Sequence, residues 1–352
     1  MTGSRSVTIG GRAVGRNAPC FVIAELGVNH NGDVALGRRL VDAAADGGAD
    51  AVKLQTFRAE RVAAPSAAKA RYQLESTAPS ESQLEMLRGL ELSADDHRIL
   101  AAHAAERGLV FLSTPFDEES AELLEELDVP AFKVASPDLT NISFLAHLAA
   151  KGRPLIVSTG MAELVEIDDA VRAVRDAGNR ALVLLQCVSS YPAPIEEQNL
   201  RTIPAMAERW GVPVGFSDHT VGSAAALAAV ALGAVVLEKH LTLDRSLEGP
   251  DHRASIEPEA FAGLVGAVRD VERALGDGLK RPTPAETVNR TVVRRSLAAA
   301  ADLPAGTLLA PELLVALRPG TGIPASRLGE LVGRRVARDV ARGELLALDD
   351  LD

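Results

Sequence analysis

Eight short apolar runs recur along the first 240 residues of this sequence, and stretches with the pattern of amphipathic helices follow them, as at 33–49, 93–108 and 166–179. The runs lie at 21–25, 51–55, 109–114, 131–136, 154–159, 181–187, 213–219 and 234–240. Strands of a parallel sheet are buried on both faces, so they read as continuous Val/Ile/Leu runs. Eightfold alternation of strand and helix predicts an α/β protein with a (β/α)8 TIM barrel. A doubly wound sheet is the alternative, although such a sheet more often has about five or six strands.

The barrel accounts for residues 1–278, and a different texture begins after it. Residues 7–18 form a predicted hairpin with a Gly-Gly turn ahead of the first run. Residues 279–286 are rich in Pro and charge and are predicted to be a linker. From 287 to 352, short apolar pieces alternate with Gly- and Pro-containing breaks, which predicts a small, irregular, β-rich domain.

Charge and cysteine content exclude several classes of function. The formal net charge is -11 and the pI is about 5.2, which argues against nonspecific binding to nucleic acid or to an anionic membrane. The only cysteines are Cys20 and Cys187, too few for a disulfide framework or a Cys-based zinc site. We find no signal-peptide pattern and no apolar stretch long enough to span a bilayer, so we expect a cytoplasmic protein.

Polar side chains follow every one of the eight predicted strands. In a (β/α)8 barrel the catalytic residues lie at the carboxyl ends of the strands. Those ends carry Glu25, Lys53, Gln55, Ser113, Thr114, Lys133, Ser136, Ser158, Thr159, Gln186, Ser217, Asp218, His219, Glu238, Lys239 and His240. Lys53 and Lys133 lie inside apolar runs and need a polar partner, because an unpaired buried charge is costly. Lysines and hydroxyls that converge on a barrel mouth suit a phosphate or a carboxylate.

Two of the predicted strands end in histidine, at His219 and His240. Neutral imidazole is the commonest side-chain metal ligand, and two imidazoles at the ends of adjacent strands would point at one spot. A pair of hydrogen-bonded histidines at strand ends is the alternative, and spacing alone does not choose between them.

The motifs, taken together, resemble those of the sialic acid synthase family, the phosphoenolpyruvate-dependent synthases of N-acetylneuraminate and related nonulosonates, including pseudaminic and legionaminic acid synthases and spore-coat relatives. The motifs are AELGVNHNGD (24–33), KLQTF (53–57), LSTPFD (112–117), KVASPDLTN (133–141), STGM (158–161), CVSSYPAP (187–194), GFSDHTVG (215–222), EKHLT (238–242), GPDHRAS (249–255) and ALGDG (274–278). In the tail, RRSLAA and LRPGTGI (317–323) resemble the family's antifreeze-like (SAF) domain. The resemblance covers nearly the whole chain.

The resemblance implies an N-acetylneuraminate synthase-type transferase. Phosphoenolpyruvate would condense with the aldehyde of an open-chain N-acylated amino hexose, water would add at C2, and phosphate would leave by C–O cleavage. His219 and His240 would hold one Mn2+ or Mg2+ ion, and Glu25 would act as the acid/base. The implied phosphoenolpyruvate-binding residues are Lys53, Thr114, Lys133, Ser136, Ser158 and Ser217. The implied sugar-binding residues are Gln55, Ser189, Tyr191, Asp251, which is also placed in the catalytic set, and Arg318.

The resemblance also implies a domain-swapped homodimer, in which Arg318 completes the partner's site. Three positions depart from the pattern of N-acetylneuraminate synthases: Ser189 replaces an Asn, Gln186 replaces a His found in many members, and Asp138 replaces a Glu. These departures leave the sugar open among N-acetylmannosamine, a 2,4-diacetamido-dideoxy hexose and an unusual sugar of a secondary-metabolite pathway.

Three other classes of function compete with this interpretation. Synthases that join phosphoenolpyruvate to arabinose or erythrose phosphates would need a further basic site and lack the tail. A metal-bound lyase or aldolase on the same barrel would need a Schiff-base lysine or more carboxylate ligands. A noncatalytic ice-binding protein would need a flat, uncharged surface, whereas this tail is rich in Arg, Asp and Glu.

Overall fold

The computed structural model describes residues 6–78 and 80–352, and the chain divides into two compact units, Met1–Gly276 and Asp277–Asp352. The first unit is the predicted (β/α)8 barrel and the second is small and irregular, so the fold class is confirmed. The boundary between the units falls two residues before the end predicted for the barrel domain.

In the described part of the chain, eight parallel strands form the sheet of the first unit. They are β3 (Phe21–Gly27), β4 (Ala51–Thr56), β5 (Val110–Pro115), β6 (Phe132–Val134), β7 (Leu155–Ser158), β8 (Leu182–Cys187), β9 (Val214–Asp218) and β10 (Val236–His240). Their order is β5-β4-β3-β10-β9-β8-β7-β6. Since β5 and β6 also lie next to each other, the sheet is a nearly closed barrel rather than a doubly wound sheet.

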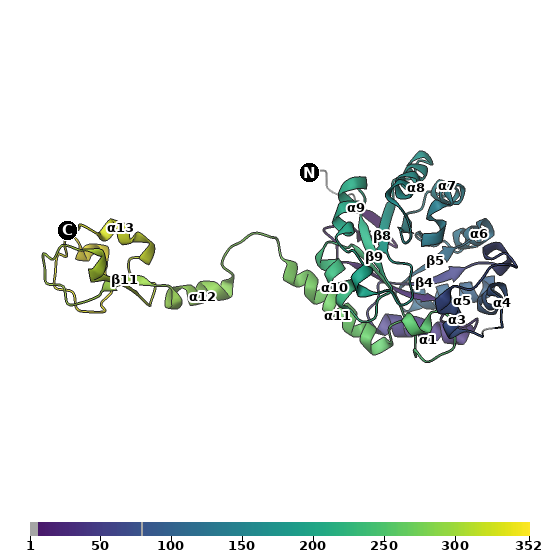
Figure 1. The fold of residues 1–352 in the computed structure, drawn as a ribbon, viewed down its shortest axis with the longest axis horizontal. Helices are drawn as coiled ribbons and strands as arrows, with labels where there is room; N and C mark the ends of the chain where they lie inside the picture. The colour runs from purple at the N-terminus through teal and green to yellow at the C-terminus, as the bar shows by residue number, and fades with distance from the viewer. Residues whose placement is uncertain (1–5, 79) are drawn as a thin grey trace. The chain divides into compact units, whose positions relative to one another are not determined.

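A helix covers the outside of the barrel after each strand, as Figure 1 shows. These helices are α1 (Val34–Asp46), α5 (Ala94–Glu106), α6 (Glu118–Glu126), α7 (Ile142–Ala150), α8 (Leu164–Asp176), α9 (Thr202–Trp210), α10 (Ala224–Ala231) and α11 (Pro258–Leu275). Several begin at capping side chains, such as Asp33, which accepts a hydrogen bond from the Ala35 N–H at 2.7 Å. Among the described residues, no helix is both long and apolar enough to cross a membrane.

The hairpin predicted at 7–18 closes the amino-terminal end of the barrel. Strands β1 (Val7–Ile9) and β2 (Arg12–Val14) pair in antiparallel fashion around Gly10 and Gly11, whose φ angles of 55° and 77° suit glycine. Hairpin residues pack in one apolar cluster with inward-facing strand residues, among them Ile23, Leu112, Ile156 and Leu185. This apolar layer fills the bottom of the barrel, so the polar residues nearer the carboxyl ends of the strands face the cavity above it.

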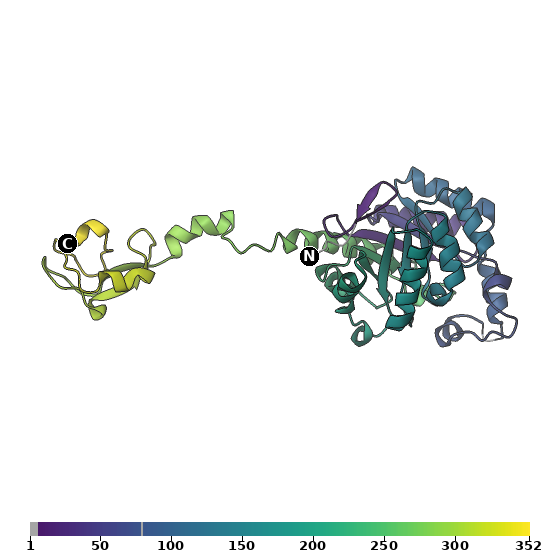
Figure 2. The ribbon, with the colours of Figure 1, turned by 90° about the horizontal axis from the view of Figure 1, so that it is seen from above.

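The connection between β4 and α5 is much longer than the others in the barrel. It carries three short helices, α2 (Ala59–Val62), α3 (Arg71–Ser76) and α4 (Gln83–Leu90). Ion pairing between Arg88 and Glu60 at 2.7 Å ties α4 to α2, and the Ala59 N–H donates to Glu91 at 2.6 Å. Residues 57–92 (dark blue in Figure 2) are called the β4–α5 segment below. They were not predicted as a structural unit.

Short 3-10 helices lie in three further connections of the barrel unit: Ser136–Thr140, Ile195–Glu197 and His252–Ala254. The second unit begins with α12 (Pro284–Val293), which starts inside the segment predicted to be a linker because Thr283 caps it. The unit also contains β11 (Ser296–Ala299), β12 (Leu314–Leu317), α13 (Leu328–Leu331) and the 3-10 helices Pro311–Leu313, Ala325–Arg327 and Leu348–Asp350. A separate core that includes Leu297, Ile323, Val336 and Leu346 holds these elements together.

Candidate active site

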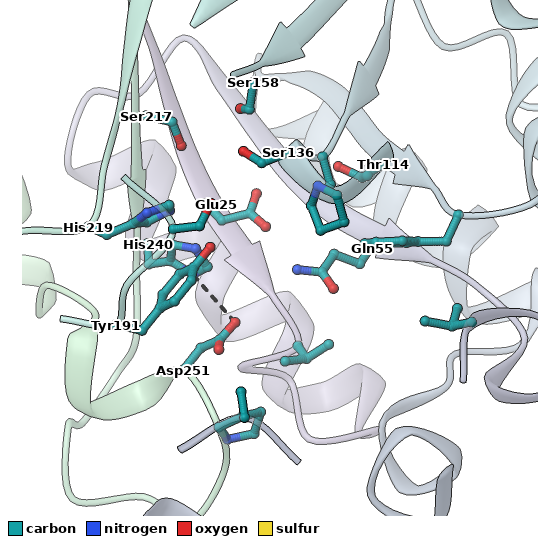
Figure 3. A pocket seen from close by; sticks show the side chains of 18 of the residues that line it. Glu25, Gln55, Thr114, Ser136, Ser158, Tyr191, Ser217, His219, His240 and Asp251 are labelled. Atoms are coloured by element: carbon teal, nitrogen blue, oxygen red, sulfur yellow. Dashed lines mark ion pairs between the residues drawn. The ribbon is translucent and has the colours of Figure 1, made fainter. Parts of the chain in front are cut away.

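One cavity of about 390 Å³ opens at the carboxyl ends of the strands and collects almost all of the predicted site residues (Figure 3). Thirteen of them line it: Glu25, Lys53, Gln55, Thr114, Lys133, Ser136, Ser158, Ser189, Tyr191, Ser217, His219, His240 and Asp251. They come together because alternate residues of each strand face inward, and the inward residues change from apolar to polar toward the carboxyl end. Arg318 is an exposed residue of the second unit, just after β12.

Lys53 is the centre of a buried network on the β3–β4–β5 side of the cavity. Its Nζ atom lies 2.7 Å from Glu25 Oε2, donates to Thr114 Oγ1 at 2.9 Å, and lies 4.0 Å from Glu238 Oε2. None of these four residues is more than 4% exposed. The polar partner that a lysine inside an apolar run requires is therefore present.

Lys133 extends the network across the barrel. Its Nζ atom donates to Ser158 Oγ at 2.8 Å and lies 3.6 Å from Glu238 Oε1. Glu238 Oε1 also accepts a hydrogen bond from Ser217 Oγ at 2.9 Å, whereas Glu238 Oε2 has no hydrogen-bond partner. Two ammonium groups and three hydroxyl groups thus converge from β4, β5, β6, β7 and β9.

Burial and neighbouring charges shift the pKa values of this network in different directions. Burial and the nearby Glu238 raise the pKa of Glu25 to about 7, although Lys53 opposes the shift. Burial lowers the pKa of Lys133, while the neighbouring Lys133 and Lys53 outweigh burial and lower the pKa of Glu238. When Glu25 is protonated, Lys53 and Lys133 face the single carboxylate of Glu238. With both lysines protonated, the network has a net positive charge that an anion would neutralise.

Backbone and side-chain donors near Ser136 continue this polar wall. Ser136 Oγ accepts a hydrogen bond from the Gly160 N–H at 3.0 Å and lies 3.7 Å from Cys187 Sγ. A Cβ atom at residue 160 would lie within 2.8 Å of both Ser136 Oγ and Ser189 Oγ, so a larger residue there would displace both hydroxyl groups.

The two predicted metal-ligating histidines lie side by side, with ring centroids 5.4 Å apart. His219 Nδ1 lies 2.8 Å from the Val188 carbonyl oxygen, so the Nδ1–H group donates a hydrogen bond to this oxygen and the lone pair of the neutral ring is on Nε2. His240 Nδ1 is buried without a hydrogen-bond partner, and Asp251 Oδ2 lies 3.7 Å from it. Burial, together with His219 and Lys53, lowers the pKa of His240 well below its usual range, so this imidazole is neutral.

Cys187 and the Val188 carbonyl group outweigh burial and raise the pKa of His219. The donor atoms of the two imidazoles suit a divalent metal ion, which would bind their unprotonated nitrogens. Among the described residues, no group of three or more His, Cys, Asp and Glu side chains is arranged to hold a metal. Substrate and water would therefore supply the other ligands, as the open positions of a catalytic metal require.

Tyr191 and Asp251 border the imidazole pair. The ring centroid of Tyr191 lies 4.2 Å from that of His219, and the ring of Tyr72 packs on its other side at 5.0 Å. Burial raises the pKa of Asp251 to about 6, although His219 and Lys53 oppose the shift. Figure 3 shows Asp251 below His240 and Gln55 across the cavity from them.

Only one of the three departures from the N-acetylneuraminate synthase pattern reaches the cavity. Gln186 is not part of the cavity wall and donates to the Gln198 carbonyl oxygen at 3.0 Å, and Asp138 also lies outside the wall. Ser189 lines the cavity. Of these three departures, only Ser189 is therefore expected to change the contacts with the sugar.

Two groups of residues that line the cavity were not predicted as site residues from the sequence. Glu238 was recognised only as a polar residue at a strand end, although its two-residue spacing from His240 places both side chains on the inner face of β10. Tyr72 and the apolar residues of the β4–α5 segment were not predicted, and no local motif marks them. All of these residues line the same cavity.

Comparisons with known proteins agree with this architecture. The model of the NeuB family matches residues 40–280, and the model of the SAF domain matches residues 294–352. The chain is 44% identical to an N,N'-diacetyllegionaminic acid synthase of Legionella pneumophila over 96% of either chain. It is 38% identical to the human N-acetylneuraminate-9-phosphate synthase, over 97% of this chain and 95% of that one.

Among solved structures, the N-acetylneuraminic acid synthetase of Leptospira borgpetersenii superposes with a TM-score of 0.74 at 34% identity, over 81% of this chain and 95% of that one. The family model alone covers well over half of the chain. The resemblance inferred from the sequence motifs is thereby confirmed, and the chain belongs to the NeuB family, with a SAF domain at its carboxyl end.

Proposed function

We propose that this protein is a transferase that condenses phosphoenolpyruvate with an N-acylated amino hexose to form a nonulosonic acid and inorganic phosphate. The observation that carries the proposal is that two different binding sites lie next to each other in one cavity. An anion site around Lys53 and Lys133 adjoins the imidazole pair of His219 and His240, and Glu25 belongs to the same buried network. The relatives named above are synthases of legionaminic acid and of N-acetylneuraminate 9-phosphate, which supports the same reaction class.

Phosphoenolpyruvate would bind in the lysine network. Its phosphate and carboxylate together need several cationic and hydroxyl donors, and Lys53, Lys133 and the hydroxyl groups beside them supply these. Ser136 and Ser217, which we also expect to contact phosphoenolpyruvate, line the same cavity. This placement brings C3 of phosphoenolpyruvate toward the imidazole pair, where the aldehyde of the sugar would lie.

The reaction balances without any further reagent. C3 of phosphoenolpyruvate forms a bond with the aldehyde carbon, and the aldehyde oxygen takes up a proton. Water adds at C2, the bond between C2 and the bridging oxygen breaks, and phosphate leaves as C2 becomes a ketone. Glu25, with a pKa of about 7, exists in both forms near neutral pH, so it can donate one proton and accept another.

A divalent ion, Mn2+ or Mg2+, bound by Nε2 of His219 and by His240 would withdraw electron density from the aldehyde oxygen. Asp251, Gln55, Ser189 and Tyr191 would position the sugar from the rim of the cavity. We further propose that Arg318 of one chain contacts the N-acyl group of the sugar bound by a second chain, in a homodimer.

The test is phosphate release from phosphoenolpyruvate with Mn2+ across a panel of acceptors, namely N-acetylmannosamine, diacetamido-dideoxy hexoses and an acid-sugar control. The proposal requires release that depends on the sugar and stops with a chelator. Release that is independent of any sugar, or that continues unchanged in chelator, would contradict it. His240→Ala should abolish release while the fold, measured by circular dichroism, is kept.

A further inference from the structure

Two loops of the barrel unit that the proposed chemistry leaves largely unused are joined to each other beside the cavity. The loop that follows β3 contributes Asn29 and Asn31, and the loop at 249–255 contributes His252 and Ser255. Asn29 Nδ2 donates to Ser255 Oγ at 2.8 Å, and Asn31 Oδ1 lies 3.2 Å from His252 Nε2. We call these four side chains the loop clamp.

One link of the loop clamp runs through Asn29, which is almost completely buried. Besides its bond to Ser255, Asn29 Nδ2 donates to the Leu241 carbonyl oxygen at 2.9 Å. Ser255 Oγ in turn donates to the Asp251 carbonyl oxygen at 2.7 Å. Because Leu241 directly follows His240, this link ties the backbone of Asp251 to the end of the strand that carries the imidazole.

The other link runs through His252, which is fully buried. Asn31 Nδ2 donates to the Glu248 carbonyl oxygen at 2.9 Å, so Asn31 Oδ1 is the atom that accepts from the Nε2–H group of His252. Nδ1 of His252 lies 2.7 Å from Thr242 Oγ1. Both ring nitrogens therefore have partners, and the residue next to Asp251 is fixed in place.

The loop clamp thereby fixes the backbone whose side chain reaches His240. Asp251 Oδ2 lies 3.7 Å from His240 Nδ1, and this nitrogen is buried with no hydrogen-bond partner in the described part of the chain (Figure 3). A carboxylate beside a metal-ligating imidazole raises the basicity of the ring and adds negative charge that attracts a cation. The metal affinity of the imidazole pair should therefore depend on where the Asp251 carboxylate lies.

We propose that the loop clamp positions Asp251 beside His240 and thereby sets the affinity of the imidazole pair for a divalent ion. The four clamp residues, all of which the structure describes, are not part of the cavity wall, so they act through Asp251 as positioning residues. The inference rests on the proposed function for the metal, but it depends neither on the identity of the sugar nor on the condensation.

The experiment measures Mn2+ binding to the full-length protein in the absence of any substrate. Free Mn2+ is followed by electron paramagnetic resonance while the ion is titrated into protein that has been freed of metal with a chelator. Asp251→Asn should weaken Mn2+ binding by about tenfold or more. Asn29→Ala and Asn31→Gly each remove one link and should weaken binding by at least about threefold. Glycine suits position 31, where φ is 50°, so the second variant is expected to fold even if the first does not.

A double-mutant cycle separates positioning from a general loss of structure. If the loop clamp acts through Asp251, Asn29→Ala and Asn31→Gly should change the Mn2+ affinity by less than about 1.5-fold when Asp251 is already Asn. Asn179→Ala is the matched control for Asn29→Ala. Asn179 is also buried and its Nδ2 group also donates to two acceptors, but it precedes β8 at the end of the barrel opposite the cavity. Its loss should leave the Mn2+ affinity unchanged.

Unchanged Mn2+ affinity in Asn29→Ala and Asn31→Gly would overturn the inference. Equal effects of these variants with and without the Asp251 carboxylate, or an equal effect of Asn179→Ala, would also overturn it. Clamp-dependent Mn2+ binding without sugar-dependent release of phosphate would support the inference and contradict the proposed reaction. If the original protein binds no Mn2+, the inference fails together with the metal site of the proposed function.

Discussion

Nζ of Lys239 lies 2.7 Å from Oδ2 of Asp218, and both side chains are almost completely buried on the outer face of the barrel. Lys239 also donates to the Thr220 carbonyl oxygen at 2.7 Å, and Asp218 Oδ1 accepts from the N–H and hydroxyl of Thr220. This ion pair joins the residue before His219 to the residue before His240. It therefore fixes the two strand ends that carry the imidazoles.

Lys239→Met should leave Asp218 as an unpaired buried charge and lower the free energy of unfolding by about 3–5 kcal/mol. Urea unfolding measures the loss. The control is Arg172→Met, which removes a surface pair with Asp169 in which both side chains are about half exposed, and it should cost no more than about 1 kcal/mol. Equal losses in the two variants would show that the buried ion pair contributes no more to the free energy of unfolding than the surface pair does.

The contrast between Lys239 and the other strand lysines shows which parts of the site a sequence pattern can predict. Lys53 and Lys133 were predicted to face the barrel mouth, and they line the cavity. Lys239 occupies the same kind of run, but the two-residue period of a strand puts it on the face opposite Glu238 and His240. Only the register of β10 with β9 and β3 decides which of these residues face inward.

Sequence patterns predicted the barrel because each buried strand is recognisable by itself. They predicted the polar end of the site because strand ends converge in any such barrel. The apolar side of the cavity, formed by Val28, Phe57, Met86, Leu87, Leu90 and Phe116, could not be predicted in this way. Its residues come from loops, from α4 and from positions just beyond two strands, and only tertiary contacts bring Val28, Leu87 and Phe116 together. Arg318 was assigned to the site by the family resemblance alone, and its contact with a second chain stays a proposal.

Glu25→Gln should lower kcat by about 10²–10⁴-fold, because it removes the group that exchanges protons during condensation. It should not weaken the binding of phosphoenolpyruvate, since it removes a carboxylate that lies 2.7 Å from Lys53. Phosphate release and calorimetric titration of phosphoenolpyruvate measure the two effects separately. Lys53→Met is the complementary variant and should weaken phosphoenolpyruvate binding. A kcat within about threefold of the original in Glu25→Gln would remove Glu25 from the proposed mechanism.

Because His30 is buried, we expect the folded protein to lose stability in mild acid. It is 1% exposed, Nδ1 accepts from the Gly32 N–H at 3.1 Å, and Nε2 has no hydrogen-bond partner. Burial lowers its pKa to about 4 in the folded state, and the nearby His97 adds to the shift. Between this value and the ordinary pKa of about 6.5, the unfolded chain binds a proton that the folded chain does not. The contribution of the neutral His30 imidazole to the free energy of unfolding is therefore complete above about pH 6.5 and is lost as the pH falls toward 4.

His30→Asn keeps an acceptor for Gly32 and removes the titrating group. The slope of the unfolding free energy against pH between 6.5 and 4 should fall by up to about 1.4 kcal/mol per pH unit. Urea unfolding at a series of pH values measures the slope, and the same comparison at pH 8, where the imidazole is neutral in both states, corrects for any loss of packing. An unchanged slope would mean that other groups cause the acid sensitivity.

Arg318→Ala should raise the KM for the sugar and leave the KM for phosphoenolpyruvate nearly unchanged, because the proposed contact is with the N-acyl group. Mixing this variant with Glu25→Gln tests whether the contact is made by a second chain. In a mixed dimer, one site would combine the intact Glu25 of one chain with the intact Arg318 of the other, while the second site would have neither. Random exchange of subunits should therefore restore about a quarter of the original activity at a sugar concentration that is limiting for Arg318→Ala. If Arg318 instead contacts the sugar bound by its own chain, no mixed dimer contains an intact site, and mixing gives only the average of the two variants.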